Sequence, residues 1–590
     1  MRLACFGLAA VAAVYFGFIG LEVETAGMVV KRYGYYMLLL TFALWLAALG
    51  RLWRQRAGGS APGRKELLGA GLAIGLCSLM AVSAEPFRSK VLFDEFVLQS
   101  TAYNMHYFRD AATMVRGYDI LGVFLSTDNY LDKRPNFFPF LISLVHDLTG
   151  YRTLNAYWLN ALLLPVTLGL SYYLGRRLAG WRGGFLALLL LGSLPLLGQN
   201  ATGSGMELLN FGMILAVAAL GGAYLRQPDD TRLSAFVLGA VLLAQSRYES
   251  ALYVLPVAGL ILLGWWQQQR IVLSWPAVVA PLLLVPYALQ NKVLNHTRWM
   301  WELRDNQETR FSVDYLGKNL RGAGEFLFST TTRYANSLTL SVLGFLALGW
   351  LLWHLGRRPP RLREIAGDRL ALFLLGGGAV INTGLVMFYY WSSFDDPMAS
   401  RFSLPLHLVF VFAVVTAAGH FVRRLPALTV LGGIVCLAAL VVSTSRFAQT
   451  LYSHAGIDEI EWEKRFVAAR PPGERLIIAN NSTLPWLLMK TPSILMGRAR
   501  LVADRVQYQI EQSTFREILV MQSLRPTTRD GDHEMTPDDR LPAAFQLELL
   551  AERRFGTKLI RISRLVALKL PPDFKPTLAA PPKSAQPGAN

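Results

Sequence analysis

Apolar stretches long enough to cross a lipid bilayer recur along most of this chain. A membrane-spanning helix needs roughly 17 to 25 such residues. The stretches lie at residues 3–21, 33–50, 67–84, 154–174, 183–198, 206–225, 233–246, 249–266, 273–290, 337–355, 370–390, 403–421 and 427–443. Two of them, 183–198 and 233–246, are short, and the chain from 233 to 266 also fits a re-entrant hairpin. The pattern predicts a polytopic α-helical membrane protein with about 11–13 transmembrane helices.

Composition supports the same fold class. Hydrophobic residues make up 53% of the chain and charged residues 17%, and the mean hydropathy is +0.34, whereas soluble domains carry about 25% charged residues. The net charge of +18 raises the question of a nucleic-acid partner. We expect none, because the Lys and Arg residues lie in short clusters between apolar stretches and not along one face. All three cysteines fall inside apolar stretches, so no disulfide framework is indicated.

Positive charge falls on alternate connections between the apolar stretches. If the N-terminus is cytoplasmic, each inward-facing connection holds Lys or Arg, as the positive-inside rule expects. These connections read RLWRQRAGGSAPGRK, GRRLAGWRG, LRQPDDTR, QQQR, HLGRRPPRLREIAGDR and HFVRRLPA. The pair Lys31 and Arg32 is the exception. The pattern predicts a multi-pass protein of the plasma (inner) membrane, whose outer face receives residues 85–153, 291–336, 391–402 and everything after about 444.

The order of these stretches suggests four parts. Residues 1–66 would form two N-terminal transmembrane helices with a basic cytoplasmic loop, and residues 67–443 the main membrane module with its outward loops 85–153 and 291–336. Residues 444–570 would form a small extracytoplasmic α/β domain. The proline-rich end, 571–590, is typical of a disordered tail.

The α/β domain is predicted from alternating helix and strand patterns. The expected elements are a helix in GIDEIEWEKRFVAAR, a strand in GERLIIA, a helix around 503–515, a strand in EILVMQSL, a helix near 543–554 and a final pair of strands, KLIRIS and LVALKL. No glycine-rich phosphate loop follows the first strand, so a dinucleotide-binding unit is not indicated.

Two adjacent carboxylates, Asp94 and Glu95, stand where the chain has just left an apolar stretch. Such a pair could bind a divalent cation through its oxygen atoms, or one member could act as a general base while the other positions the substrate. The same residues also suit the first turn of a helix, where acidic side chains complement the helix dipole. Spacing alone does not separate these interpretations.

The same outward loop holds a basic segment, YLDKRPNFFPFLISLVHDLTGYR. Lys133 and Arg134 precede Pro135, and an aromatic amphipathic run follows. A segment of this kind can hold two cations at the level of the lipid headgroups, where a lipid phosphate lies. Ordinary interfacial anchoring by Lys, Arg and Phe gives the same pattern.

Together these motifs resemble the GT-C superfamily of integral-membrane glycosyltransferases over approximately residues 67–421. The resemblance rests on the Asp-Glu pair, the helical run FVLQSTAYNMHYFRDAATMVRGYDIL after it, and the basic Pro-aromatic segment ending in LTGY. It is closest to the branch of protein O-mannosyltransferases, aminoarabinose transferases and bacterial family 39-like enzymes. AQSRYESALYVLP, with Arg247 and Glu249, is similar to an Arg-x-Glu element of these enzymes, and FYYWSSFDDPMASRFSLPLHLVF resembles their late Arg-aromatic element, with Arg401. Ionisable residues at membrane depth are costly and mark functional sites, although helix-end snorkelling is the alternative.

The resemblance implies a reaction. Family members transfer a sugar from a polyprenyl-phosphate donor, with inversion, to an acceptor at the outer face of the membrane. By motif, Asp94 would be the base and Glu95 would orient a substrate. Lys133, Arg134 and Arg401, with Arg247 as a further candidate, would bind the carrier phosphate and stabilise it as it leaves. The acceptor, whether glycan, lipid or protein, is left open.

Some relatives carry Glu-Lys-Pro at the basic segment, whereas this chain has Lys133-Arg134-Pro135, with Asp132 one residue earlier. We therefore carry over no metal site, and a divalent cation stays an open question. Further candidates for substrate binding are His106, Glu249, Asp395 and Asp396. For the two aspartates, capping of the helix near residue 398 is the equal alternative.

Two other function classes fit a membrane protein of this composition. In a transporter or flippase, the ionisable groups would line a passage, and repeated halves with broken helices at the midplane would be expected. In a lipid-linked oligosaccharide ligase, the donor would be a glycan on a diphosphate. The polar groups concentrate on one side of this chain, which favours the glycosyltransferase.

Overall fold

The computed structural model describes residues 1–55, 63–297, 309–331, 333–357, 361, 365–422, 455–471, 474–524 and 540–570. The stretch predicted at 427–443 and the predicted tail, 571–590, lie outside the described residues. The chain forms two compact units. The first contains residues 1–91 and 133–296 with the described residues of 301–451, and the second contains 92–132 with the described residues of 452–570.

The first unit is a bundle of apolar helices. Ten helices or helix pairs within the described ranges are long and apolar enough to cross a membrane. They are α1 with the π-helical turn η1 (Arg2–Val14, Tyr15–Ile19), α2 (Val23–Arg54), α3 (Arg64–Ala84), α6 (Asn155–Gly192), α8 (Glu207–Arg226), η2 with α10 (Tyr248–Tyr253, Val254–Gln268), α11 with α12 (Trp275–Leu283, Val285–His296), α14 (Leu338–Arg357), α15 (Gly367–Val386) and η5 with α16 (Ser400–Ser403, Leu404–Val422). The protein is therefore a polytopic α-helical membrane protein.

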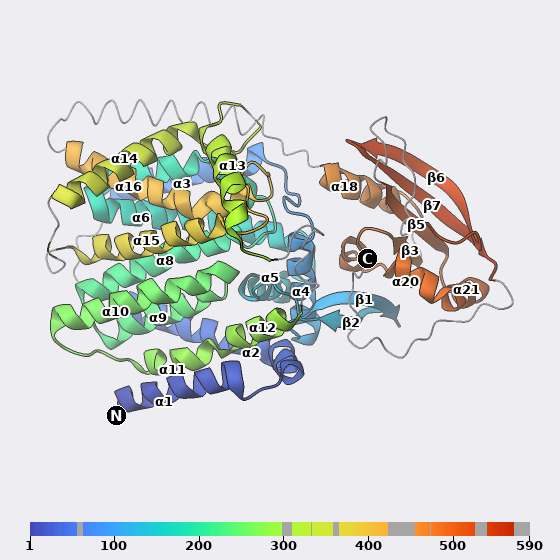
Figure 1. The fold of residues 1–590 in the computed structure, drawn as a ribbon, viewed down its shortest axis with the longest axis horizontal. Helices are drawn as coiled ribbons and strands as arrows, with labels where there is room; N and C mark the ends of the chain where they lie inside the picture. The colour runs from blue at the N-terminus through green and yellow to red at the C-terminus, as the bar shows by residue number, and fades with distance from the viewer. Residues whose placement is uncertain are drawn as a thin grey trace. The chain divides into compact units, whose positions relative to one another are not determined.

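Shorter helices complete this unit: α5 (Phe137–Thr149), α7 (Pro195–Ala201), α9 (Asp230–Ala244), η4 (Val313–Tyr315) and α13 (Leu316–Phe328). Figure 1 shows α6, α8, α14, α15 and α16 packed side by side. Helix α8 is the most buried of the long apolar helices, which explains why its sequence is apolar on all sides.

Helix α6 contains nearly all of the predicted stretch 154–174 and most of the stretch 183–198, and the end of the second stretch lies in α7. Helix α6 is sharply interrupted between the two stretches, at Ala179 and Gly180. Gly180 has a φ of 73°, a conformation that glycine adopts without strain. The two halves then pack closely, because a Cβ atom on Gly175 would lie 2.5 Å from the carbonyl oxygen of Gly183. The predicted turn GRRLAGWRG therefore exists, although no long loop separates the helices.

The second unit contains a five-stranded sheet with the order β4-β3-β5-β7-β6. The strands are β3 (Arg475–Ala479), β4 (Ser493–Leu495), β5 (Glu517–Leu524), β6 (Phe545–Phe555) and β7 (Lys558–Leu568). Strands β4, β3 and β5 run parallel, and β5, β7 and β6 are antiparallel. The helices of this unit are α4 (Asp94–Phe108), α18 (Ala455–Ala468), α19 (Leu484–Leu488), α20 (Met496–Leu501) and α21 (Ala503–Glu511).

Alternate residues of β3 serve two cores, as a strand buried on both faces requires. Leu476 and Ile478 pack with α20 and α21, whereas Ile477 packs with Trp486 of α19 and with α18. The helices therefore cover both faces of the sheet. This agrees with the predicted small sheet domain and with its first helix and first strand.

The prediction of a helix near 543–554 is wrong, because that segment is the edge strand β6. Its Leu, Glu, Ala and Arg residues favour a helix, but the segment pairs with β7 across a turn at Gly556, where φ is 59°. Charged side chains join the two strands, as between Arg561 and Glu552 at 2.8 Å. The predicted final pair of strands is the single strand β7.

The predicted helical run after Glu95 is wrong beyond Phe108. Helix α4 ends there, and the chain continues as an antiparallel hairpin, β1 (Thr113–Ile120) and β2 (Val123–Tyr130). The hairpin turns at Leu121 and Gly122, which both have positive φ values, 56° and 81°. Two such residues are the mark of the tight turn that matches the twist of a hairpin.

Candidate functional site

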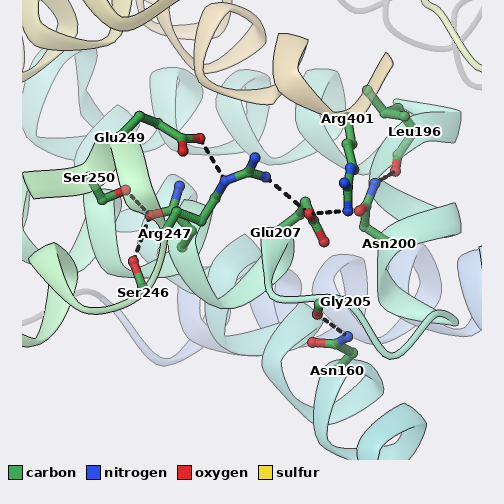
Figure 2. Close-up of polar contacts among 11 residues, drawn as sticks. Asn160, Leu196, Asn200, Gly205, Glu207, Ser246, Arg247, Glu249, Ser250 and Arg401 are labelled. Atoms are coloured by element: carbon green, nitrogen blue, oxygen red, sulfur yellow. Dashed lines mark hydrogen bonds and ion pairs between the residues drawn. The ribbon is translucent and has the colours of Figure 1, made fainter. Parts of the chain in front are cut away.

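Glu207 and two arginines form a buried ionic cluster in the helical unit (Figure 2). The Oε1 atom of Glu207 accepts hydrogen bonds from Nη1 of Arg247 at 3.0 Å and from Nη1 of Arg401 at 2.7 Å. The three side chains are only 2%, 3% and 5% exposed, respectively. A single carboxylate oxygen thus holds two guanidinium groups at once.

The start of α8 places Glu207. This residue is the first of the helix, where the helix dipole favours an anionic side chain. The connection before it is held by Asn160, whose Nδ2 donates to the carbonyl oxygens of Gly203 at 2.9 Å and Gly205 at 2.8 Å. The carboxylate position is therefore set by a buried polar contact between α6 and this connection (Figure 2).

The end of α9 places Arg247. Asn210 of α8 accepts hydrogen bonds at its Oδ1 from the hydroxyl groups of Ser246 at 2.7 Å and Ser250 at 2.5 Å, which flank Arg247 in the chain. Nε of Arg247 also forms an ion pair with Oε1 of Glu249 at 2.6 Å. The Arg-x-Glu element therefore brings both of its charged members into one site.

The turn η5, just before α16, supplies Arg401. Both guanidinium groups lie over the ring of Phe402, Arg247 at 5.0 Å and Arg401 at 5.3 Å from the centroid, as cation–π contacts. A small cavity lies beside the cluster, lined by Glu207, Asn210, Phe211, Arg247, Glu249, Arg401, Phe402, Leu404 and Pro405. The start of α8, the end of α9 and the start of α16 therefore meet at one end of the bundle.

Sequence reasoning missed Glu207. The residue lies within the apolar stretch 206–225, and an ionisable residue at membrane depth is itself a signal of function. The same rule that selected Arg247 and Arg401 selects Glu207 once it is applied to every apolar stretch.

The basic segment is attached to the same end of α9. The backbone N–H of Phe137 donates to the carbonyl oxygen of Gln245 at 3.3 Å, two residues before Arg247. Nε2 of Gln290 in α12 donates to the carbonyl oxygen of Arg134 at 3.0 Å, and Arg134 is 7% exposed. A second small cavity lies here, lined by Val30, Gly34, Leu38, Pro135, Asn136, Gln245, Pro286, Tyr287 and Gln290. Lys133 and Arg134 thus belong to a segment fixed by buried contacts.

Asp94 and Glu95 are the first two residues of α4, in the second unit. Successive helical residues point in different directions. Accordingly, Glu95 is buried at 1% exposure, whereas Asp94 is only partly buried. Of the pair, Asp94 is therefore the more exposed carboxylate, and Glu95 is buried in the interior.

Backbone strain marks the residue before Asp94. Phe93 has φ 57° and ψ −53°, and the N–H of Asp94 donates to the carbonyl oxygen of Leu92 at 2.5 Å. This is a γ-turn with a positive φ at a bulky residue, which is rare and strained. Strain of about 1–3 kcal/mol persists only where surrounding structure enforces it, and it clusters at functional sites.

Buried polar contacts hold α4 on the hairpin. Thr101 and Thr113 share a hydroxyl hydrogen bond of 2.8 Å, and Nδ2 of Asn104 donates to the carbonyl oxygen of Ala112 at 2.8 Å. The hydroxyl of Tyr103 donates to the carbonyl oxygen of Phe124 at 2.7 Å. These contacts attach the helix that carries Asp94 to the hairpin.

The sheet domain also contacts α4. Nζ of Lys464 in α18 lies 5.3 Å from the ring centroid of Phe96, one residue after Glu95. Nζ of Lys490 donates to the hydroxyl of Tyr107 at 3.1 Å. Burial lowers the pKa of Lys464. The C-terminal domain and the helix that carries the carboxylate pair thus belong to one unit.

The remaining candidates lie apart from these groups or have local partners. His106 is in the last turn of α4, about 18 Å from Asp94 along the helix axis at 1.5 Å per residue. Asp396 accepts a hydrogen bond from the backbone N–H of Met398 at 2.8 Å, and Asp395 accepts one from the hydroxyl of Ser393. The two aspartates therefore stabilise the turn before Arg401. Within the described residues, no three His, Cys, Asp or Glu side chains cluster as a metal site would require.

Comparison with known proteins gives distant similarities. No protein-family model matches the sequence, and no curated protein matches it significantly. Among solved structures, the chain is similar to ArnT from Cupriavidus metallidurans bound to undecaprenyl phosphate, with 15% identity and a TM-score of 0.48 over 85% of this chain and 98% of that one. For the apo state of ArnT the identity is 16% and the TM-score 0.43, with the same coverage of 85% and 98%. For the arabinosyltransferase EmbB from Mycobacterium smegmatis the identity is 17% and the TM-score 0.33, over 71% of this chain and 45% of that one. Similarities this distant assign no function.

Proposed function

We propose that this chain is a membrane glycosyltransferase of the GT-C type. It transfers a sugar from a polyprenyl-phosphate donor to an acceptor at the outer face of the membrane, with inversion at the sugar carbon. The observation that carries the proposal is the buried cluster of Arg247, Glu207 and Arg401 at one end of an apolar helix bundle. Arginines at that depth are costly and suit the recognition of an anion that arrives with a lipid tail.

The motif residues have different roles in this reaction. Asp94 takes the proton from the acceptor hydroxyl as its oxygen attacks the sugar carbon, and Glu95 orients a substrate. The bond from that carbon to the phosphate oxygen breaks, and the phosphate leaves with the electron pair. Lys133, Arg134 and Arg401, with Arg247, stabilise the developing negative charge on the phosphate. The partial exposure of Asp94 supports its role as the base.

The test is a transfer assay with the purified full-length protein in detergent. The protein receives a panel of polyprenyl-phosphate sugars together with a membrane extract as the source of acceptor, and mass spectrometry follows the release of free polyprenyl phosphate. We expect release by the wild type, and release that is about 100-fold slower or more in Asp94→Asn, as the loss of a general base predicts. Parallel reactions with and without EDTA decide whether a divalent cation is required.

Asp128→Asn is the matched control. Asp128 lies in the same unit, is 44% exposed and pairs with Arg116 at the surface, so its loss costs little stability. This variant should release the carrier at the wild-type rate. If the wild type consumes no donor from the panel in the presence of the extract, the proposal is overturned and the transporter class becomes the better explanation.

A further inference from the structure

We propose that Glu207 is an internal competitor of the carrier phosphate. In the donor-free protein its carboxylate occupies the two guanidinium groups that the phosphate would bind, and after transfer it returns to them and so speeds the departure of the spent carrier. The inference rests on the proposed function for the identity of the anion. Nothing in the sequence motifs assigns this residue a role.

The geometry of the cluster is that of an occupied anion site. One oxygen of Glu207 accepts from both Arg247 and Arg401, at 3.0 Å and 2.7 Å. A phosphate oxygen that accepts from two guanidinium groups takes the same position, because guanidinium groups bind carboxylate and phosphate in the same way. The first turn of α8, where Glu207 lies, favours either anion through the helix dipole.

The charges of the cluster already balance. Arg247 forms a second ion pair with Glu249, so two guanidinium groups face two carboxylates. Lys133 and Arg134 would offset the charge of an incoming phosphate, but they do not free the guanidinium groups of Arg247 and Arg401. Those groups are already engaged by Glu207 and Glu249, and a phosphate oxygen that binds between them competes with the Glu207 carboxylate for the same donors. Binding of the carrier therefore requires that Glu207 give up at least part of its contact with the arginines.

Competition between Glu207 and the phosphate predicts that one substitution in the site strengthens binding of the carrier. Glu207→Gln keeps the size of the side chain but removes its charge, so the arginines lose a competing anion. We expect the variant to bind polyprenyl phosphate, used without a sugar, with a Kd about tenfold lower than that of the wild type. We also expect kcat to fall, since release of the carrier is slowed, whereas Arg401→Gln should raise the Kd.

The measurement is the Kd of the full-length protein for polyprenyl phosphate in detergent, together with kcat in the transfer assay. A Glu207 that only supports the fold would give unchanged or weaker binding in Glu207→Gln, and either result overturns the inference. If Glu207→Gln does not fold, Glu249→Gln replaces it. Glu249 is 18% exposed and pairs with Arg247, so we expect a smaller tightening, about threefold, and unchanged or weaker binding contradicts the inference equally.

The opposite end of the bundle offers a matched control. Asp368 of α15 is also a buried carboxylate between two arginines, Arg177 and Arg226. Asp368→Asn should leave the Kd for polyprenyl phosphate unchanged, so that any tightening is specific to Glu207. A wild type that neither binds nor releases the carrier overturns the proposed function along with the inference. A wild type that does both, with weaker binding in Glu207→Gln, overturns the inference alone.

Discussion

Oε1 of Glu207 and Nη1 of Arg401 lie 2.7 Å apart, although 194 positions separate the residues in the sequence. Both side chains are at least 95% buried, at 2% and 5% exposure. A buried charge without a partner is very unfavourable, so each residue makes the position of the other possible. The contact also joins the start of α8 to the turn before α16, and this fixes the end of the bundle at which the cluster lies.

Replacement of Arg401 tests its assignment to the carrier phosphate. Arg401→Gln removes one guanidinium group and leaves Glu207 paired with Arg247. We expect the donor KM to rise about tenfold or more, because charge-assisted hydrogen bonds to phosphate are strong. Arg177→Gln, at the other end of the bundle, is the control and should leave the donor KM unchanged. If both KM and kcat of Arg401→Gln equal those of the wild type, Arg401 does not belong to the phosphate site.

The apolar pattern predicted the helices well, because each span depends on its own composition. The predicted stretches 183–198 and 233–246 became the second half of α6 with α7, and the short helix α9. The membrane depth of Arg247, Glu249 and Arg401 indicates a functional site, and in the structure all three line one small cavity. Their common partner, Glu207, comes from a different helix, and no local pattern links it to them.

The errors lie where pairing across the chain decides the local structure. The residues of β6 favour a helix when taken alone, and only the hairpin with β7 makes them a strand. Similarly, the β1–β2 hairpin depends on a turn at Leu121, a residue that rarely takes a positive φ. A tight hairpin turn is usually recognised by Asn or Gly at both of its central positions, and here only Gly122 fits that pattern.

Leu121 offers a stabilising substitution. Its φ is 56° and its side chain is 99% exposed, so the leucine carries backbone strain without any burial in return. Leu121→Asn creates the Asn-Gly pair that this type of turn prefers, and we expect a gain of about 0.5–1 kcal/mol in stability. The measurement is the Tm of the purified protein. Leu121→Ala lacks the short polar side chain that hydrogen-bonds locally and so stabilises Asn at a positive φ, and it should give no such gain. An equal gain in both variants would contradict this explanation.

Glu463 predicts a pH dependence of stability. Burial, with the neighbouring Glu459 as a second cause, raises the pKa of Glu463 to about 8. The folded protein therefore binds this proton more tightly than the unfolded chain. The stability that Glu463 contributes through this proton is fully present below about pH 4.5 and is lost as the pH rises to about 8. The free energy of unfolding falls by no more than about 1.4 kcal/mol per pH unit over this range.

The variant Glu463→Gln removes this titration. Its Tm should fall less than that of the wild type between pH 5 and pH 8, so that the difference between the two proteins grows with pH. Glu461→Gln changes an exposed carboxylate, 43% accessible, on the same helix and serves as the control. Parallel Tm curves for the wild type and Glu463→Gln across this range would show that Glu463 does not titrate there.

Asp368 tests how far the opposite end of the bundle depends on charge. This carboxylate lies in the first turn of α15 and is 5% exposed, with Nε of Arg177 at 3.0 Å and Arg226 as its second partner. Arg226 lies in the last turn of α8. The acidic Asp368 at a helix start and the basic Arg226 at a helix end each complement the dipole of their own helix. Asp368→Asn should lower the free energy of unfolding by about 1–3 kcal/mol, less than for a fully buried pair, because the two arginines are one-third exposed and water can solvate them. The transfer rate at a temperature below the transition should stay unchanged, since the carboxylate lies at the end of α8 opposite Glu207. A Tm equal to that of the wild type would mean that packing around Gly222 and Gly367, which both lie against this junction, holds the helices together without the ion pairs.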